Sequence, residues 1–319
     1  MSSTSSSYAL HFTLIFLLMA KGSFGTVLTL VNRCDYTVWP GILSNAGSSG
    51  LDTTGFQLPP RATRSFQAQP GWSGRFWGRT GCSFDPTTGI GRCETGDCGS
   101  NQIQCNGAGA TPPATLAEFT IGSGTQDFYD VSLVDGYNLP MIIQPVGGSG
   151  ACGSTGCVTD VNRMCPNELR AGDGQGCKSA CEAFGNPEYC CRGAYGSPNT
   201  CRPSVYSEMF KNACPRSYSY AFDDATSTFT CSGADYTITF CPSLTSQKSS
   251  RDSSSTTAGN WLPPPAGDDS DSGPQDDLTS WLPNFVIGGS SDLALQSSSA
   301  ALVLCVGAIS LSLLTFLQL

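Results

Sequence analysis

The chain has 319 residues, a net charge of −9 and only 13% charged residues, a composition that favours a β-rich extracellular protein over a cytosolic enzyme. With 16 basic residues against 25 acidic ones, it lacks the basic surplus that nucleic-acid binding requires. Its one histidine, His11, lies in the N-terminal apolar stretch, so the mature protein is expected to have no histidine chemistry. We therefore expect no metal site and no cofactor.

Residues 1–25 have the pattern of a secretory signal peptide. The stretch 10–20 is mostly apolar, and Ser23 and Gly25 place small residues at the two key positions of a cleavage site. A membrane anchor is the alternative, but the apolar stretch is shorter than the roughly 20 helical residues that span a bilayer. We expect a mature chain that enters the secretory pathway.

Cysteine is the most informative residue type in this chain. Sixteen of the 17 cysteines lie between Cys34 and Cys241, and the last, Cys305, stands in the final apolar run. So many cysteines predict an oxidising compartment, and an even number can pair completely. Spacing alone does not fix the connectivity, although the adjacent Cys190 and Cys191 are poor partners for each other on geometric grounds.

Short segments of alternating polarity dominate the cysteine-rich block. They are rich in Val, Ile, Thr and aromatic residues and are separated by Gly and Pro, which is typical of the strands of a β-sandwich. One short helix is expected around residues 178–184. The fold class is therefore mainly β. The expected strands include residues 26–31, 36–39, 130–134 and 236–240.

The composition changes after Pro242. Residues 243–299 are rich in Ser, Pro and Asp and predict a disordered stalk. Residues 300–319 carry no charge, and small residues at 288–291 precede them at a spacing of about eight residues, which fits a GPI-attachment signal. A transmembrane tail and a cleaved sorting peptide are the alternatives. We expect a lipid anchor to hold the protein at the extracellular face of the plasma membrane, and otherwise a location in the apoplast or cell wall.

Residues 89–98, GIGRCETGDC, closely resemble the signature of the thaumatin family. Within this motif, Glu94 and Asp97 lie between closely spaced cysteines, so we expect both to be structural. The resemblance covers residues 26–242, and it identifies the chain as a plant thaumatin-like protein of the pathogenesis-related family five. Further matching segments follow in the family's order: residues 32–40, 75–80, 115–119, 130–138 and 190–191.

The resemblance implies a flattened β-sandwich with two disulfide-rich lobes and a cleft between the sandwich and the larger lobe. The sandwich would use residues 26–79, 119–158 and 215–242, the small lobe 80–118, and the loop-rich lobe 159–214. Eight disulfides are implied: Cys34–Cys241, Cys82–Cys93, Cys98–Cys105, Cys152–Cys231, Cys157–Cys214, Cys165–Cys177, Cys181–Cys190 and Cys191–Cys201.

Family members with antifungal activity share one arginine and four carboxylates in the cleft. Crowded carboxylates raise one another's pKa, and a glycosidase needs one protonated and one ionised carboxyl. We assign Glu118 as the acid and Asp130 as the base or nucleophile. Arg75 and Asp135 would orient the substrate, and Asp224 would tune the field, while the adjacent Asp223 must point elsewhere if Asp224 faces the cleft. The matching positions are Arg75, Glu118, Asp130, Asp135 and Asp224.

Structural roles compete with these assignments. Asp130 and Asp135 could cap a turn, and Arg75 could be an ordinary ion-pair partner. Tyr129, Tyr137 and Phe222 could stack on sugar rings or belong to the core.

We predict an extracellular, monomeric defence-type protein that binds cell-wall β-1,3-glucan in an acidic cleft, with weak endo-glucanase and antifungal activity. The first alternative is a non-catalytic cell-surface module that binds carbohydrate or a basic protein. The second is an inhibitor of hydrolases that acts through surface loops.

Overall fold

The structure, a computed structural model, describes residues 25–243. The expected signal peptide up to residue 24, the stalk from residue 244 and the apolar tail with Cys305 lie outside the described residues. Within the described part, no helix is long and apolar enough to span a bilayer.

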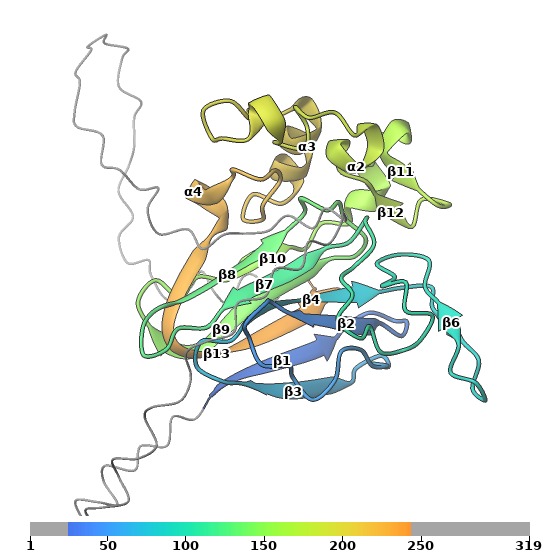
Figure 1. The fold of residues 1–319 in the computed structure, drawn as a ribbon, viewed down its shortest axis with the longest axis vertical. Coiled ribbons are helices and arrows are strands. Elements are labelled where there is room, and N and C mark those ends of the chain that lie inside the picture. Colours follow the sequence, from blue (N-terminus) through green and yellow to red (C-terminus); the bar gives the residue numbers. More distant parts are fainter. Residues whose placement is uncertain (1–24, 244–319) are drawn as a thin grey trace, which may run out of the picture. The chain divides into compact units, whose positions relative to one another are not determined.

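One curled sheet of nine strands forms the body of the domain (Figure 1). Seven strands follow the order β10-β9-β13-β8-β7-β4-β2, and β1 pairs with β13 in parallel and with β3 in antiparallel. The strands are β1 (Thr26–Asn32), β2 (Trp39–Ser44), β3 (Thr63–Ala68), β4 (Ser73–Arg79), β7 (Leu116–Thr120), β8 (Asp127–Ser132), β9 (Met141–Ser149), β10 (Thr155–Cys157) and β13 (Phe229–Phe240).

The long strand β13 joins two halves of this sheet. Its first residues pair with β8, and its later residues pair with β9 and β1. The sheet therefore folds back on itself, and side chains from both halves meet in the core. The ring centroids of Phe66 in β3 and Phe76 in β4 are 6.1 Å apart, although these strands do not pair. Those of Phe119 in β7 and Tyr236 in β13 are 5.3 Å apart.

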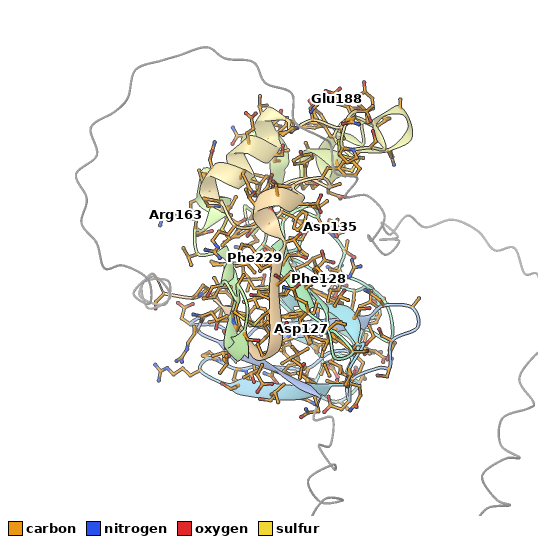
Figure 2. All side chains as sticks on the ribbon, turned by 90° about the vertical axis from the view of Figure 1, so that its left-hand side faces the viewer. Asp127, Phe128, Asp135, Arg163, Glu188 and Phe229 are labelled. Atoms are coloured by element: carbon orange, nitrogen blue, oxygen red, sulfur yellow. A yellow bond between two sulfur atoms is a disulfide. The ribbon has the colours of Figure 1, made fainter. Side chains whose placement is uncertain are left out.

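The remaining elements belong mainly to two lobes. Two short hairpins and several helical turns connect the disulfide-linked loops, and α2 and α3 gather beyond the sheet in both views (Figures 1 and 2). They are β5 (Ser83–Phe84), β6 (Gly91–Arg92), β11 (Arg170–Ala171), β12 (Gly176–Cys177), η1 (Val161–Met164), η2 (Asn167–Leu169), η3 (Gly193–Tyr195), α2 (Ala180–Phe184), α3 (Val205–Ala213) and α4 (Asp224–Ser227).

The expected mainly β fold and its eight disulfides are confirmed. The bonds join the same cysteine pairs that the family resemblance implies. The bond between Cys34 and Cys241 spans 207 residues and connects the chain just after β1 to the chain just after β13. On the loop-entropy model a closure of this length stabilises the folded state by about 5 kcal/mol.

Several boundaries differ from the sequence-based expectation. The strand expected at 36–39 begins only at Trp39, because the Asn32 side chain accepts from Cys34 N and donates to Tyr36 O, which curls the intervening chain. The strand expected at 130–134 ends at Ser132, where Leu133 starts a turn closed by Gly136 N.

The helical content was underestimated. The helix expected near 178–184 is α2, which Ser179 caps, but α3 was not expected. Its start is marked by a capping box between Ser204 and Ser207, in which serine takes the position that Glu or Gln occupies in the usual sequence signature.

Arg79, at the end of β4, attaches the small lobe to the sheet. The side chain is fully buried, and its guanidinium donates to the carbonyl oxygens of Trp39 at 2.9 Å and Ile103 at 2.6 Å. Longer contacts of 3.4 and 3.5 Å reach the carbonyls of Pro40 and Gln102. Burial lowers the pKa of Arg79 to about 10, and Asp97 opposes this decrease, so the group stays charged at neutral pH.

Candidate functional site: an acidic row across three strands

Three of the five expected site residues form one row across adjacent strands. Arg75 of β4 lies opposite Glu118 of β7, and Glu118 lies opposite Asp130 of β8. Residues directly opposite each other in a sheet point to the same face. The next register row, Phe76, Ala117 and Val131, is fully buried in the core. The charged residues therefore share the face that points away from the core, and we call them the acidic row.

The row contains polar atoms that the protein leaves unpaired. Arg75 Nε lies 3.5 Å from Glu118 Oε1, and these side chains are 23% and 17% exposed. Arg75 Nε and Asp130 Oδ1 are both buried, yet neither makes a hydrogen bond with a described residue. Because buried polar atoms are nearly always hydrogen-bonded, such atoms indicate a place where water or a ligand binds.

Asp135 lies in the turn that follows β8. Gly136 adopts φ +83°, and a Cβ there would come within 2.6 Å of the carbonyl oxygen of Cys177, so the turn requires glycine. The Asp135 carboxylate makes no hydrogen bond within residues 25–243 and does not cap the turn. Figure 2 shows Asp135 between the strands and the helices of the loop-rich lobe.

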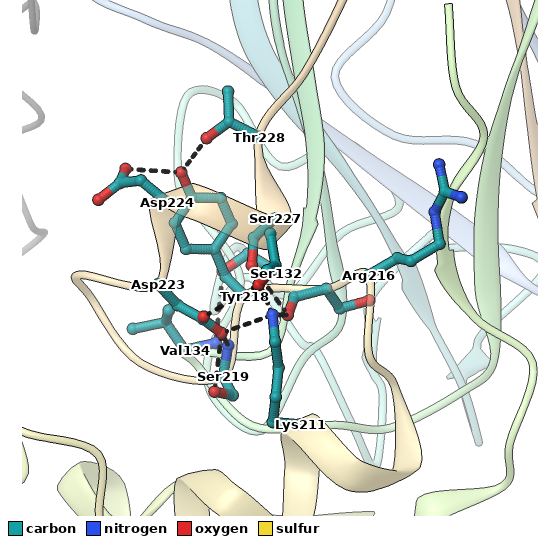
Figure 3. Close-up of polar contacts among 12 residues, drawn as sticks. Ser132, Val134, Lys211, Arg216, Tyr218, Ser219, Asp223, Asp224, Ser227 and Thr228 are labelled. Atoms are coloured by element: carbon teal, nitrogen blue, oxygen red, sulfur yellow. Dashed lines mark hydrogen bonds and ion pairs between the residues drawn. The ribbon is translucent and has the colours of Figure 1, made fainter. Parts of the chain in front are cut away.

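The neighbouring Asp223 and Asp224 have different partners (Figure 3). Asp223 Oδ2 accepts from Ser219 N and Oγ at 3.0 and 2.9 Å and forms an ion pair with Lys211 at 2.9 Å. Asp224 begins α4, is exposed, and among residues 25–243 accepts only from the hydroxyl of Tyr218, at 2.8 Å. Asp223 thus fixes the loop before α4, whereas Asp224 is left with a free carboxylate oxygen.

Tyr218 is a site residue that sequence reasoning missed. Its hydroxyl contacts both Asp224 and Thr228. The pKa of this tyrosine is raised mainly by burial, and the charge of Asp130 raises it further. The backbone of Tyr218 bonds to β8, donating to Val131 O and accepting from Leu133 N. Tyr218 thereby connects the acidic row to Asp224. No motif marks this residue in the sequence, because its role depends on the pairing of a loop with β8.

The pKa values of the carboxyls in this site are set by their burial, by their repulsion of one another and by the charge of Arg75. Burial raises the pKa of Glu118; Arg75 lowers it, and Asp135 raises it further. Burial and the neighbouring Glu118 raise the pKa of Asp130 well above its usual range; Arg75 opposes this rise and Asp224 adds to it. The pKa of Asp135 is also raised by burial, against the effect of Arg75. The site therefore has a high affinity for protons.

The comparisons with known proteins agree with the sequence motifs. The family model described as Thaumatin family matches residues 32–242. This chain belongs to the thaumatin family.

Thaumatin-like protein 1 of Arabidopsis thaliana is 69% identical over 242 residues, covering 74% of this chain and 93% of that protein. A protein of Prunus avium named glucan endo-1,3-beta-glucosidase is 51% identical over 227 residues, covering 69% and 92%. Among solved structures, a thaumatin-like xylanase inhibitor matches at 27% identity and a TM-score of 0.38, covering 67% of this chain and 99% of that one. Pathogenesis-related relatives and eight disulfides fit an extracellular or apoplastic location.

Two of the three candidate stacking residues of this thaumatin-like domain belong to the core. Tyr129 is 1% exposed and its hydroxyl donates to Gly153 O, while Tyr137 is fully buried and donates to Thr159 O. Neither ring is accessible to a sugar, and only Phe222 is partly exposed. Among the described residues, no group of three His, Cys, Asp or Glu side chains is arranged to hold a metal ion.

Proposed function

We propose that this thaumatin-like protein binds β-1,3-glucan at the acidic row, with Asp135 and Asp224 beside it, and hydrolyses the glucan weakly. The observation that carries the proposal is the unpaired, buried Asp130 Oδ1 next to Glu118, two carboxyls whose pKa values are raised together. The relative from Prunus avium, named glucan endo-1,3-beta-glucosidase, supports this choice of substrate.

The contacts favour roles for the two carboxyls that are the reverse of those assigned from sequence. Arg75 lies against Glu118 and stabilises its ionised form, whereas Asp130 has the more strongly raised pKa. Asp130 would then be protonated and donate its proton to the glycosidic oxygen. Glu118 would attack the anomeric carbon, and water would later hydrolyse the glycosyl ester with Asp130 as the base.

The register also favours one stereochemical outcome. Residues directly opposite in an antiparallel pair have Cβ atoms about 4.5–5.5 Å apart. Retaining glycosidases have carboxyls about 5–5.5 Å apart, and inverting ones about 6.5–9.5 Å. We therefore expect any cleavage of β-1,3-glucan to retain the β configuration, which NMR of freshly released products would detect.

Release of reducing sugar from laminarin by the purified domain tests the proposal. Wild type should release sugar, Asp130→Asn and Glu118→Gln should not, and Asp173→Asn should match wild type because it makes the same carboxyl-to-amide change at an exposed site. Wild type that retains glucan in a pull-down without releasing sugar would replace the enzyme with a non-catalytic glucan-binding module. Absence of both binding and release would overturn the proposal and favour a hydrolase inhibitor or a receptor for a basic protein.

We further propose that a GPI anchor holds the protein at the outer face of the plasma membrane. The support is the sequence of residues 288–319, with its small residues, short spacer and uncharged end. Phosphatidylinositol-specific phospholipase C should release the protein from intact cells. Protein that remains on the treated membrane would exclude this form of attachment.

A further inference from the structure

A cavity of about 730 Å³ lies apart from the acidic row. It opens between the ends of β2 and β4, the small lobe and the loop that carries η1, and none of the five expected site residues lines it. Small-molecule sites in proteins commonly have volumes of about 300–1,000 Å³. The cavity is therefore large enough for a ligand of several rings. Its lining includes Tyr36, Trp39, Glu94, Asp160, Asn162 and Arg163.

Asn162, which lines this cavity, has one unpaired hydrogen-bond acceptor. Its Nδ2 donates to the carbonyl oxygens of Asn138 at 3.0 Å and Gln175 at 3.1 Å, which fixes the orientation of the amide. Its Oδ1 is buried and makes no hydrogen bond within the described part of the chain. A fixed and unpaired amide oxygen is suited to accept a hydrogen bond from a ligand hydroxyl.

Glu94 adds a carboxylate to the same wall. Asp97 of the same motif is structural as expected, because it accepts from Cys93 N and Gly99 N. The Glu94 carboxylate, in contrast, makes no hydrogen bond with residues 25–243, although its Oε2 lies 2.4 Å from where a Cβ on Gly81 would be. Gly81 thus leaves room for a carboxylate that the fold does not use.

Two aromatic side chains complete the lining. Tyr36 is 43% exposed, and the one hydrogen-bond contact of its hydroxyl within the described part of the chain is with Cys241 Sγ, at 3.6 Å. Trp39 packs on Phe84 with ring centroids 4.8 Å apart. The indole N–H groups of the buried Trp72 and Trp77 donate hydrogen bonds, whereas that of Trp39 donates to no described residue.

The charges of the lining restrict the class of ligand. Glu94 and Asp160 are acidic and Arg163 is basic, so the cavity offers no cluster of cations for a phosphate or sulfate. Burial, then Asp35 and Asp160, raise the pKa of Tyr36, which keeps its hydroxyl neutral and able to donate. Carboxylate, amide and hydroxyl groups beside aromatic rings suit a neutral ligand with many hydroxyls and an apolar ring face.

We infer that this cavity is a second carbohydrate site, which binds a short neutral oligosaccharide independently of the acidic row. It would let the domain contact two stretches of polysaccharide at once, which strengthens attachment to a polymer without any increase in the affinity of either site.

Calorimetric titration of the intact domain with laminaripentaose, cellopentaose and xylopentaose tests this inference. At least one probe should bind to Glu118→Gln, in which the acidic row is inactivated, and adding either Tyr36→Ala or Glu94→Gln to this variant should weaken that binding by about tenfold. Glu94→Gln is the safer variant for folding, since its carboxylate has no protein partner to lose. Failure of all three probes to bind would overturn the inference, as would binding that only Glu118→Gln abolishes.

NMR of the tryptophan indole groups provides an independent readout. The bound probe should shift the Trp39 indole signal in wild type and in Glu118→Gln, while the Trp72 and Trp77 signals stay in place. Assignment comes from the loss of one signal in Trp39→Phe. If laminarin hydrolysis fails but the Trp39 signal shifts, the proposed enzyme activity is wrong and the second site stands. If hydrolysis is intact but the Trp39 signal does not move, the enzyme activity stands and the second site is wrong.

Discussion

The two arginines of β4, Arg75 and Arg79, differ in how many hydrogen bonds their guanidinium groups make within the protein. This difference distinguishes a structural arginine from one in the candidate site. Arg79 is fully buried and donates hydrogen bonds to backbone carbonyls that include those of Trp39 and Ile103. Arg75, four residues earlier, makes no hydrogen bond through Nε, which has only an ion-pair contact of 3.5 Å with Glu118 Oε1. Because a guanidinium offers five donors, full use of them indicates a structural attachment, and incomplete use indicates a place for a ligand.

The largest expected effect is on stability at Arg79. Arg79→Met removes charged donors from at least two carbonyl oxygens and should reduce the free energy of unfolding by about 3 kcal/mol or more. For a domain of this size, that corresponds to a fall in Tm of about 6–12 °C. Thermal unfolding with the disulfides intact measures it. At pH 3, where the carboxyls beside Arg75 are protonated, Arg75→Met should change Tm by only about 1–3 °C, and a loss equal to that of Arg79→Met at this pH would contradict the distinction.

The second effect concerns the charge of Arg75. Arg75 opposes the rise in pKa of Glu118, Asp130 and Asp135, so Arg75→Met should raise the pKa of all three carboxyls further. Titration of the carboxyl ¹³C signals of these three residues measures this change. The same variant should retain less glucan in a pull-down. If the titration midpoints of the three carboxyls do not change in Arg75→Met, Arg75 is not the counter-charge of this site.

The third effect is a gain in stability on neutralising Asp130. A carboxyl with a raised pKa binds its proton more tightly in the folded chain, so stability is highest below the ordinary pKa of about 4 and falls as pH rises towards the raised value. Asp130→Asn removes this loss of stability at high pH. It should raise Tm at pH 7 by about 2–4 °C for each kcal/mol of unfolding free energy regained, and change Tm little at pH 3. A lower Tm at pH 7 would contradict the electrostatic assignment.

The smallest effect is expected at Tyr218. Tyr218→Phe keeps the ring and removes the hydroxyl that holds Asp224, which should reduce laminarin hydrolysis by about two- to fivefold and change Tm little. Tyr195→Phe is a matched control, since it removes a hydroxyl from an exposed tyrosine outside the acidic row. If Tyr218→Phe loses as much laminarin hydrolysis as Glu118→Gln, Tyr218 would instead belong to the reacting groups.

Local sequence pattern predicted the mainly β class and parts of three strands, β1, β8 and β13, because alternation is a property of each strand by itself. It failed where tertiary contacts decide the conformation: Asn32 bends the chain before Trp39, and the serine capping box at Ser204 starts a helix without the usual glutamate. The family resemblance, and not spacing, supplied the cysteine pairing.

The candidate residues were identified from the sequence, but their arrangement was not. Glu118 was placed in the small lobe, whereas it lies on β7, and the acidic row exists only because β4, β7 and β8 are neighbours. The choice between Asp223 and Asp224 depends on Lys211, which belongs to α3, a helix that was not expected. The cavity near Tyr36 combines loops that are far apart along the chain, so no local pattern could indicate it.

The disulfide between Cys34 and Cys241 also has a mechanical consequence. Tension applied to the chain at residue 243 reaches Cys241 first, and from there a covalent bond transmits it to the segment after β1. The force is therefore shared between the ends of two parallel, hydrogen-bonded strands and does not peel β13 away from its neighbours one bond at a time. A domain closed in this way can carry load between a surface to which its C-terminal segment is attached and a polymer bound to its face.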